Sequence, residues 1–200
     1  MYDNVREFKH DYMKIYSSMS ILLENNNIDE LKNFFYSSIV PLQNDIFESS
    51  TALHTVSKIH NEIIQGVIYS YALKAKNIGI NFNINIADDI PDLPEISAVD
   101  FARILGIFLD NAFEAALKST ERLVAFGAVH TAQNVVFVIK NSFDTAPDLG
   151  RIFEENYSLK GKDRGIGMGI AKRLVDRYEN VYLDVGTKDR CFIIKISFVI

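Results

Sequence analysis

Two neighbouring residues near the start of the chain, His10 and Asp11, are the first whose types suggest chemistry. A neutral imidazole is a nucleophile, and an adjacent carboxylate can hold its tautomer or accept its proton. Apolar residues recur at intervals of three and four from Val5 to Leu22, which is the pattern of a heptad seam along a helix. With Val5 and Phe8 at heptad positions a and d, His10 falls at f, on the solvent side. A His–Asp pair on a charged helix face is also typical of a plain solvated surface, so the pair alone leaves both interpretations open.

The second group of candidate residues lies in FLDNAFEAA (108–116), where Asn111 and Glu114 interrupt a largely apolar helical pattern. A polar side chain that is buried in such a helix needs a partner. An assembly of Mg²⁺ and phosphate is one such partner, because this cation takes oxygen ligands, including amide carbonyls. The alternative is that both residues lie on the solvent-exposed face of an amphipathic helix.

The third group is LKGKDRGIGMGIAKRL (159–174), in which glycines at every second position precede a helical pattern. Glycine lets the backbone approach a phosphate closely, and a helix N-terminus supplies free N–H donors. The glycines are Gly165, Gly167 and Gly169, and positive charge just upstream comes from Lys160, Lys162 and Arg164. The spacing is neither a Rossmann fingerprint, which follows a first βα strand, nor a Walker A loop.

Composition and charge exclude several classes of protein. A formal net charge of −5 argues against a nucleic-acid binder that neutralises phosphates. The single cysteine, Cys191, forms no internal disulfide, which favours a reducing compartment. No run reaches the ~18 apolar residues that a membrane span needs, and the start of the chain is too polar for a signal peptide. His54, His60 and His130 lack further ligands at metal spacing, so we expect them to be structural. We therefore expect the chain to be a soluble, intracellular part of a protein.

The elements that must position these groups fall into two parts. Residues 1–57 carry two amphipathic helical patterns, separated at Asn25–Asn27. Asp29 is a candidate N-cap for the second helix, and Pro41 should kink that helix. Two helices joined by a short turn form an antiparallel hairpin, which buries too little surface to stand alone. Since each helix has one apolar stripe, we expect two chains to pair into a four-helix bundle.

Residues 58–200 alternate between helical and strand periodicity. The spacing predicts helices at 61–78, 98–118 and near 167–179, and strands at 81–87, 122–131, 134–143, 180–186 and 191–199. Gly79 should end the first helix, and Gly186–Arg190 (GTKDR) is typical of a hairpin turn between the last two strands. This order predicts an α+β sandwich, with a mixed sheet covered by helices on one face.

The order and spacing of the three groups are more specific than any one of them. REFKHDY (6–12), DNAFEA (110–115) and IFEENYSLKGKDRGIGMGIAK (152–172) resemble the H, N, F and G boxes of sensor histidine kinases. The nearest resemblance is to the peptide-sensing quorum kinases of the AgrC/ComD type. It implies a dimerisation and histidine-phosphotransfer hairpin over 1–57, followed by a GHKL, or Bergerat-fold, ATPase domain over 58–200. It also implies membrane helices of a sensor upstream, so that this chain resembles the cytoplasmic portion of a membrane-bound receptor.

The resemblance assigns roles to individual residues. It implies that His10 is the phosphoacceptor with Asp11 as its acid/base partner, and that Asn111 chelates the Mg²⁺ of bound ATP. The remaining nucleotide-binding residues that it implies are Phe153 of the F box, Lys160 and Arg164 of the ATP lid, and Gly165, Gly167 and Gly169 of the G box. The implied partners are a second copy of the chain, bound through the hairpin, and the receiver domain of a response regulator.

Three positions depart from the family pattern. Ile107 stands four residues before Asn111, where the GHKL superfamily usually has Glu or Asn. The adenine-reading Asp of the DxG box corresponds to Asn141, in NSF rather than DxG. Lys14 occupies a position where relatives often carry an Asn that is linked to dephosphorylation of the regulator.

These residues together predict ATP-dependent autophosphorylation of His10, followed by phosphoryl transfer to an aspartate of a response regulator. The alternative is a GHKL ATP-binding scaffold or pseudokinase without phosphotransfer, which the missing DxG box favours. A dimeric interaction protein that binds no nucleotide is the third possibility.

Overall fold

The computed structural model describes residues 17, 20–22, 24–25, 27–30, 55–154 and 166–200. The chain divides into two compact units, Met1–Glu48 and Ser49–Ile200. The division of the chain at residues 57 and 58 into a phosphotransfer hairpin and a catalytic domain stays a prediction.

The described part of the first unit contains the end of one helix and the start of the next. Residues 20–22 and 24 are helical, and Asn25 N–H and Asn27 N–H donate to the carbonyls of Ile21 and Leu22, each at 3.0 Å. Helical residues resume at 28–30. The predicted break at Asn25–Asn27 is therefore confirmed. The prediction of Asp29 as the N-cap is wrong: Asp29 is already helical, and Oδ1 of Asn27 accepts from the N–H of Glu30 at 3.4 Å. The heptad seam up to residue 16 and Pro41 lie outside the described residues.

The second unit begins its regular structure with helix α4 (Glu62–Ile78). Oδ1 of Asn61 accepts hydrogen bonds from the N–H groups of Ile63 and Ile64, at 3.1 and 3.2 Å, and so caps the helix. Gly79 ends α4 in the left-handed region at φ 68°, with its N–H bonded to the carbonyl of Ala75. The predicted helix at 61–78 and its glycine stop are confirmed.

A single five-stranded sheet follows, in the order β1-β2-β3-β5-β4. Strands β1 (Asn81–Ile86) and β2 (Leu123–His130) are parallel, because the chain crosses over through a helix between them. Strands β3 (Asn134–Ser142), β4 (Val181–Lys188) and β5 (Cys191–Val199) add antiparallel pairs. The predicted mixed sheet is thereby confirmed.

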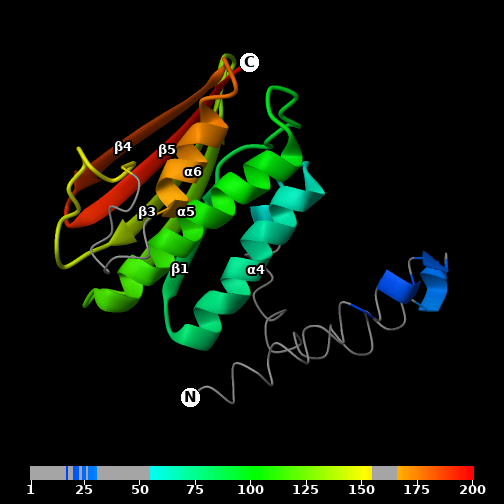
Figure 1. Ribbon diagram of the computed structural model, residues 1–200, viewed down its shortest axis with the longest axis horizontal. Helices are drawn as coiled ribbons and strands as arrows, with labels where there is room; N and C mark the ends of the chain where they lie inside the picture. Colours follow the sequence, from blue (N-terminus) through cyan, green and yellow to red (C-terminus); the bar gives the residue numbers. More distant parts are fainter. Residues whose placement is uncertain (1–16, 18–19, 23, 26, 31–54, 155–165) are drawn as a thin grey trace. The chain divides into compact units, whose positions relative to one another are not determined.

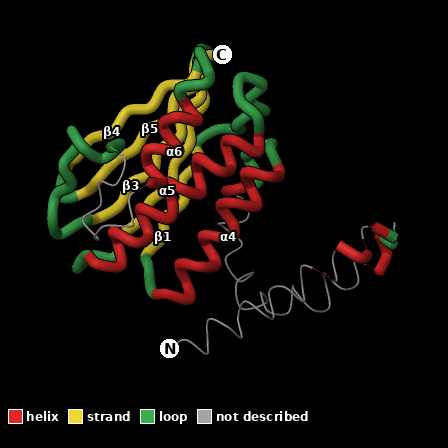
Figure 2. The backbone as a smooth tube through the Cα atoms, viewed as in Figure 1, coloured by secondary structure: helices red, strands yellow, loops and turns green. Residues whose placement is uncertain are grey.

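Three helices among the described residues of this unit cover one face of the sheet (Figure 1, Figure 2). They are α4, α5 (Ala98–Lys118) and α6 (Ile166–Val175), and α5 packs on β3 at the centre. Phe101 of α5 meets Phe137 and Phe198 edge to face, with ring centroids 4.9 and 5.0 Å apart. These rings form the core between the two layers, because along β3 the odd-numbered residues up to Asn141 are buried. The α+β sandwich is confirmed.

Two predicted boundaries need correction. Strand β4 continues to Lys188, which pairs with Cys191, so the predicted turn Gly186–Arg190 narrows to Asp189 and Arg190. Both residues have positive φ, 50° and 57°, as a two-residue hairpin turn of the mirror-image type requires. Helix α6 ends at Val175 rather than near 179. Within the part of the chain that the structure describes, no helix combines the length and apolarity needed to cross a membrane.

Candidate nucleotide-binding site

Asn111 lies in the middle of α5, half-buried between fully buried neighbours such as Ala112 and Phe113. Its Nδ2 donates to the main-chain carbonyl of Ile107, one turn earlier, at 2.9 Å. This bond uses one N–H of the amino group and so fixes the orientation of the amide, and among the described residues no donor is bonded to Oδ1. Since Mg²⁺ binds amide groups through oxygen, the side chain presents the atom that a metal ion would use.

The neighbouring carboxylate, Asp110, has a different role from Asn111. Its Oδ1 forms an ion pair with Nζ of Lys74 on α4, 2.7 Å away. Burial, together with the charge of Asp110, raises the pKa of Tyr71, whose hydroxyl donates to the carbonyl of Gly106 at 2.9 Å. Asp110 therefore joins α5 to α4, and it was not identified from the sequence as a structural residue.

The first turn of α6 lies against Asn111. A Cβ atom at Gly167 would be 3.3 Å from Cγ2 of Ile107 and 3.8 Å from Nδ2 of Asn111. The glycine thus allows the two helices to approach where the predicted metal ligand and the predicted phosphate loop meet. At this contact, Ile107 supplies packing instead of the polar side chain that the family pattern has there.

Two residues further along α6, Gly169 contacts the F-box segment. A Cβ atom at this buried glycine would be 3.2 Å from the carbonyl oxygen of Phe153, closer than carbon and oxygen normally approach. Phe153 itself is half-buried, and the preceding Ile152 is buried in the fold. The sequence groups at 152–154 and 167–169 are therefore in direct contact.

Asn141 lies near the end of β3 and is 2 % exposed. It is in phase with Val135, Phe137 and Ile139, so its side chain lies on the face of the sheet that the helices cover. Its Nδ2 donates to the main-chain carbonyl of Ser142 at 3.0 Å. A buried amide at this position can hydrogen-bond to the edge of a base that enters between the layers.

Two serines that the sequence patterns did not single out connect these elements. The hydroxyls of Ser119, at the C-terminal end of α5, and Ser142, at the end of β3, are 2.6 Å apart, and both side chains are buried. The only signal in the sequence is a short polar residue at the end of each apolar pattern, which is common at chain turns. The pairing of α5 with β3 could not be foreseen from such a signal.

Four of the predicted nucleotide-site residues thus occur at neighbouring contacts. Asn111 meets Gly167 and Gly169 meets Phe153, all at the junction of α5, α6 and the F-box segment. Asn141 lies on β3, the strand over which α5 packs. The remaining predicted residues, His10, Asp11, Lys160, Arg164 and Gly165, lie outside the described residues. The chemistry of this arrangement suits a nucleotide: an amide oxygen for a cation, a glycine-rich helix start for phosphates and a buried amide for a base.

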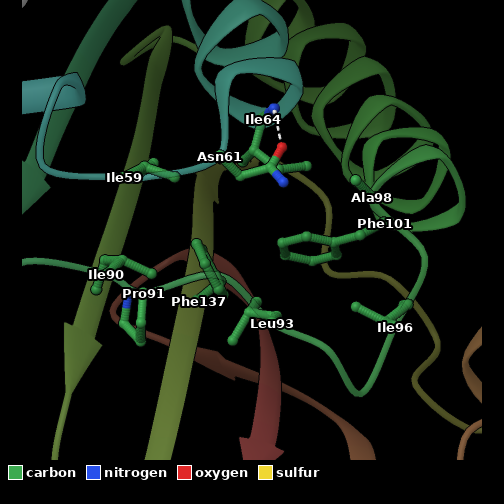
Figure 3. Close-up of a pocket in the computed structure, with 10 residues that line it drawn as sticks. All are labelled: Ile59, Asn61, Ile64, Ile90, Pro91, Leu93, Ile96, Ala98, Phe101 and Phe137. Atoms are coloured by element: carbon green, nitrogen blue, oxygen red, sulfur yellow. Dashed lines mark hydrogen bonds between the residues drawn. The ribbon is translucent and has the colours of Figure 1, made fainter.

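A separate apolar pocket lies elsewhere in the same unit (Figure 3). It is lined mainly by aliphatic residues of the segments around Ile59 and Ile90–Ile96, together with the rings of Phe101 and Phe137. Asn61, the one amide in its lining, is engaged in capping α4 (Figure 3). The pocket contains none of the predicted nucleotide-site residues, so it is not the candidate site.

Comparison with known proteins identifies the family of this chain. Residues 96–199, just over half of the chain, match the GHKL domain. The Sensor protein CitS of Bacillus subtilis (strain 168) is 25% identical over 174 residues, which cover 85% of this chain and 31% of CitS. The chain spans about a third of the length of the relatives it matches.

Solved structures share the fold at low sequence identity. The catalytic domain of histidine kinase ThkA has a TM-score of 0.58 at 18% identity, covering 70% of this chain and 91% of that domain. ThkA in complex with the response regulator protein TrrA has a TM-score of 0.57 at 12% identity, covering 98% of this chain and 63% of that one. This chain belongs to the GHKL domain family. The proteins that it resembles in sequence and fold carry the names of sensor proteins and histidine kinases.

Proposed function

We propose that the chain is the phosphotransfer and catalytic region of a two-component sensor histidine kinase. ATP bound between α5, α6 and the sheet donates its γ-phosphoryl group to a nitrogen of the His10 imidazole, and ADP leaves. The phosphoryl group then passes to an aspartate of a response regulator. The observation that carries this proposal is the contact of Asn111 with Gly167 and of Phe153 with Gly169, because it joins three separate sequence boxes at one site.

The residues at this site fit the magnesium ion that accompanies ATP. Oδ1 of Asn111 has no bonded donor among the described residues, whereas Nδ2 of the same side chain is bonded to Ile107. A single amide ligand is sufficient, because Mg²⁺ in phosphate-transfer sites keeps several waters and takes its other ligands from the phosphates. The ion would offset negative charge on the phosphates as the γ-phosphoryl group is transferred.

The ATP lid and the phosphoacceptor complete the proposal. We infer that Lys160 and Arg164 approach the phosphates, that Gly165 begins the G box and that Asp11 accepts or holds a proton of His10. A solvent-facing f position would leave the His10 side chain accessible first to the ATP-binding domain and then to the response regulator. One structural neighbour, ThkA, forms a complex with the response regulator protein TrrA, and this supports the same class of partner here.

We propose in addition that the chain acts as a dimer, through the helical hairpin at 1–57, and as the cytoplasmic portion of a membrane-bound receptor. The finer assignment to the peptide-sensing quorum type rests on the motif resemblance of REFKHDY (6–12), DNAFEA (110–115) and the segment 152–172. The relatives matched by comparison carry other names, CitS, DpiB and DcuS.

The test is the chemistry of the label that the chain acquires. Incubation with Mg²⁺ and γ-labelled ATP should give a phosphate that is stable to alkali and lost in acid, as a phosphoramidate is. His10→Gln should abolish the label while ATP binding stays normal. ATP binding without any label on the wild-type chain would support the alternative, a GHKL scaffold without phosphotransfer. A chain that binds no ATP would contradict both.

A further inference from the structure

Asn141 is held in one orientation by the residue that follows it. Its Nδ2 lies 3.0 Å from the main-chain oxygen of Ser142. A carbonyl oxygen only accepts hydrogen bonds, so the group of the amide that faces it must be the amino group. The amide oxygen of Asn141 therefore lies on the other side, and no donor among the described residues is bonded to it.

Ser142 is in turn fixed by contacts on two sides. It is 1 % exposed, and its Oγ is 2.6 Å from Oγ of Ser119. The same Oγ accepts from the N–H of Leu123, at the start of β2, at 2.9 Å. Ser119 also bonds to the carbonyl of Ala116, in the last turn of α5, at 3.0 Å. These bonds fix the end of β3 against α5 and β2, so the carbonyl that holds Asn141 has little freedom to move.

The orientation of the Asn141 side chain matters because an amide has one donor end and one acceptor end, whereas the two ends of a carboxylate are alike. An unrestrained Asn can turn its side chain over and present either an acceptor or a donor to a base. A carboxylate presents acceptors alone. If one N–H of the amino group is tied to a carbonyl, the amide cannot turn over, and its oxygen stays on the opposite side, where it acts toward a base as an acceptor.

We propose that Ser142, supported by Ser119, is a positioning residue that fixes the Asn141 amide with its oxygen toward the base and so makes the site select a 6-amino purine over a 6-oxo purine. The inference rests on the proposed function, because it takes Asn141 as the residue that meets the base. An oxygen accepts from the 6-amino group of adenine, whereas against a 6-oxo group two acceptors would face each other.

The experiment compares the affinities of the folded chain for ATP and for inosine triphosphate, in which a 6-oxo group replaces the 6-amino group. Wild-type chain should bind ATP about ten- to hundredfold more tightly, the usual effect of leaving a buried polar group without its partner. Ser142→Ala and Ser119→Ala should each lower that ratio several-fold, since a freed amide can turn over and donate to the 6-oxo group.

The matched control is Ser70→Ala. The Ser70 hydroxyl on α4 bonds to the carbonyl three residues earlier, as that of Ser119 does, but it is exposed and lies on another helix. Its removal should leave the ratio of the two affinities unchanged. Ser119→Ala decides the question if Ser142→Ala fails to fold, because the Leu123 N–H keeps its partner in that variant.

The outcomes separate this inference from the proposed function. Equal wild-type affinity for the two nucleotides overturns the inference while ATP binding, and with it the proposed function, stands. A wild-type preference for ATP that survives in a folded Ser142→Ala or Ser119→Ala variant also overturns the positioning role. A chain that binds neither nucleotide overturns the proposed function, and this inference with it.

Discussion

Gly169 of α6 lies so close to Phe153 that a Cβ atom there would be 3.2 Å from the Phe153 carbonyl oxygen. The obstacle is main chain, which cannot rotate away as a flexible side chain would. The contact joins a helix that starts at the G box to the segment that carries the F box. A larger residue at 169 must therefore separate these two parts of the candidate nucleotide site.

The first prediction concerns this contact. Gly169→Ala should weaken ATP binding several-fold, because the added methyl group pushes the 149–154 turn away from α6. Overpacking of this kind costs about 1–3 kcal/mol, of which the better helix propensity of alanine recovers about 1 kcal/mol. Titration calorimetry with Mg²⁺-ATP and thermal unfolding would measure the two effects separately.

Gly66→Ala is the matched control for the first prediction. Gly66 is an exposed glycine inside α4 whose Cβ atom would meet nothing within 4 Å. The change should raise the free energy of unfolding by about 0.5–1 kcal/mol and leave ATP affinity alone. Normal ATP affinity in Gly169→Ala would show that the contact between Phe153 and Gly169 does not shape the site.

The second prediction concerns the metal. Asn111→Ala should weaken the Mg²⁺-dependent part of ATP binding by at least about tenfold. Removal of a residue that only hydrogen-bonds to a metal ligand already lowers metal affinity by about ten- to hundredfold. The fold should persist, because the half-buried side chain leaves no large cavity. The measurement is ATP affinity with and without Mg²⁺. If Mg²⁺ strengthens ATP binding equally in both proteins, then Asn111 only bonds to its own helix.

The third prediction concerns stability and pH. The Tyr178 hydroxyl donates to Oδ2 of Asp100 at 2.6 Å, which ties the chain after α6 to the first turn of α5. This hydrogen bond, with some desolvation, raises the pKa of Tyr178 above its ordinary value. Tyr178→Phe should lower the free energy of unfolding by about 1–2 kcal/mol at neutral pH.

The raised pKa gives this prediction a definite sign. The folded chain holds the Tyr178 proton more tightly than the unfolded chain, so the stabilisation is complete below about pH 10 and declines as the pH rises further. The difference between wild type and Tyr178→Phe, measured by urea unfolding, should therefore shrink in that range. Tyr182→Phe is the control, because Tyr182 is 56% exposed and its change should have little effect at any pH. A constant difference across pH 8–11 would contradict the role of the hydrogen bond.

The fourth prediction concerns the dimer, and it uses two variants with opposite defects. His10→Gln should keep ATP binding without accepting phosphate, whereas Asn111→Ala should keep His10 without binding Mg²⁺-ATP. If transfer crosses the dimer, mixing the two should restore label on the chain that retains His10. A mixture that stays unlabelled although subunits exchange would show transfer within one chain.

The heptad seam provides a separate check on that dimer. Ile15→Asp together with Met19→Asp places like charges in the seam and should give monomers in sedimentation. A double variant that remains dimeric would contradict the four-helix bundle, whatever the labelling experiment shows.

The sequence by itself determined the elements of the second unit and the types of its site residues. Local signals are strong there: Asn61 and Gly79 delimit α4, and alternation of polar and apolar residues along Asn81–Ile86 predicts a half-buried strand. The boxes around Asn111 and Gly167 were visible as polar or glycine residues in apolar surroundings. Such features depend on neighbours within one or two turns, which is why pattern alone reveals them.

Tertiary structure alone decided which of these residues meet. No local signal pairs Gly167 with Asn111, or Gly169 with the carbonyl of Phe153, because each contact joins segments that are separated in the sequence. The same holds for the boundary of the last hairpin. Pairing of Lys188 with Cys191 extended β4 into the expected loop, since a register across two strands outweighs the turn preference of Gly186.

The orientation of the Asn141 amide shows most clearly what the sequence determines and what only the tertiary structure decides. The sequence shows an amide where the family has a carboxylate, and by itself it cannot say which end of that amide faces a base. The hydrogen bond to the Ser142 carbonyl, and the contact of Ser142 with Ser119 at the far end of α5, decide it. A side chain with both a donor and an acceptor takes its direction from the groups around it, and only the folded chain brings those groups together.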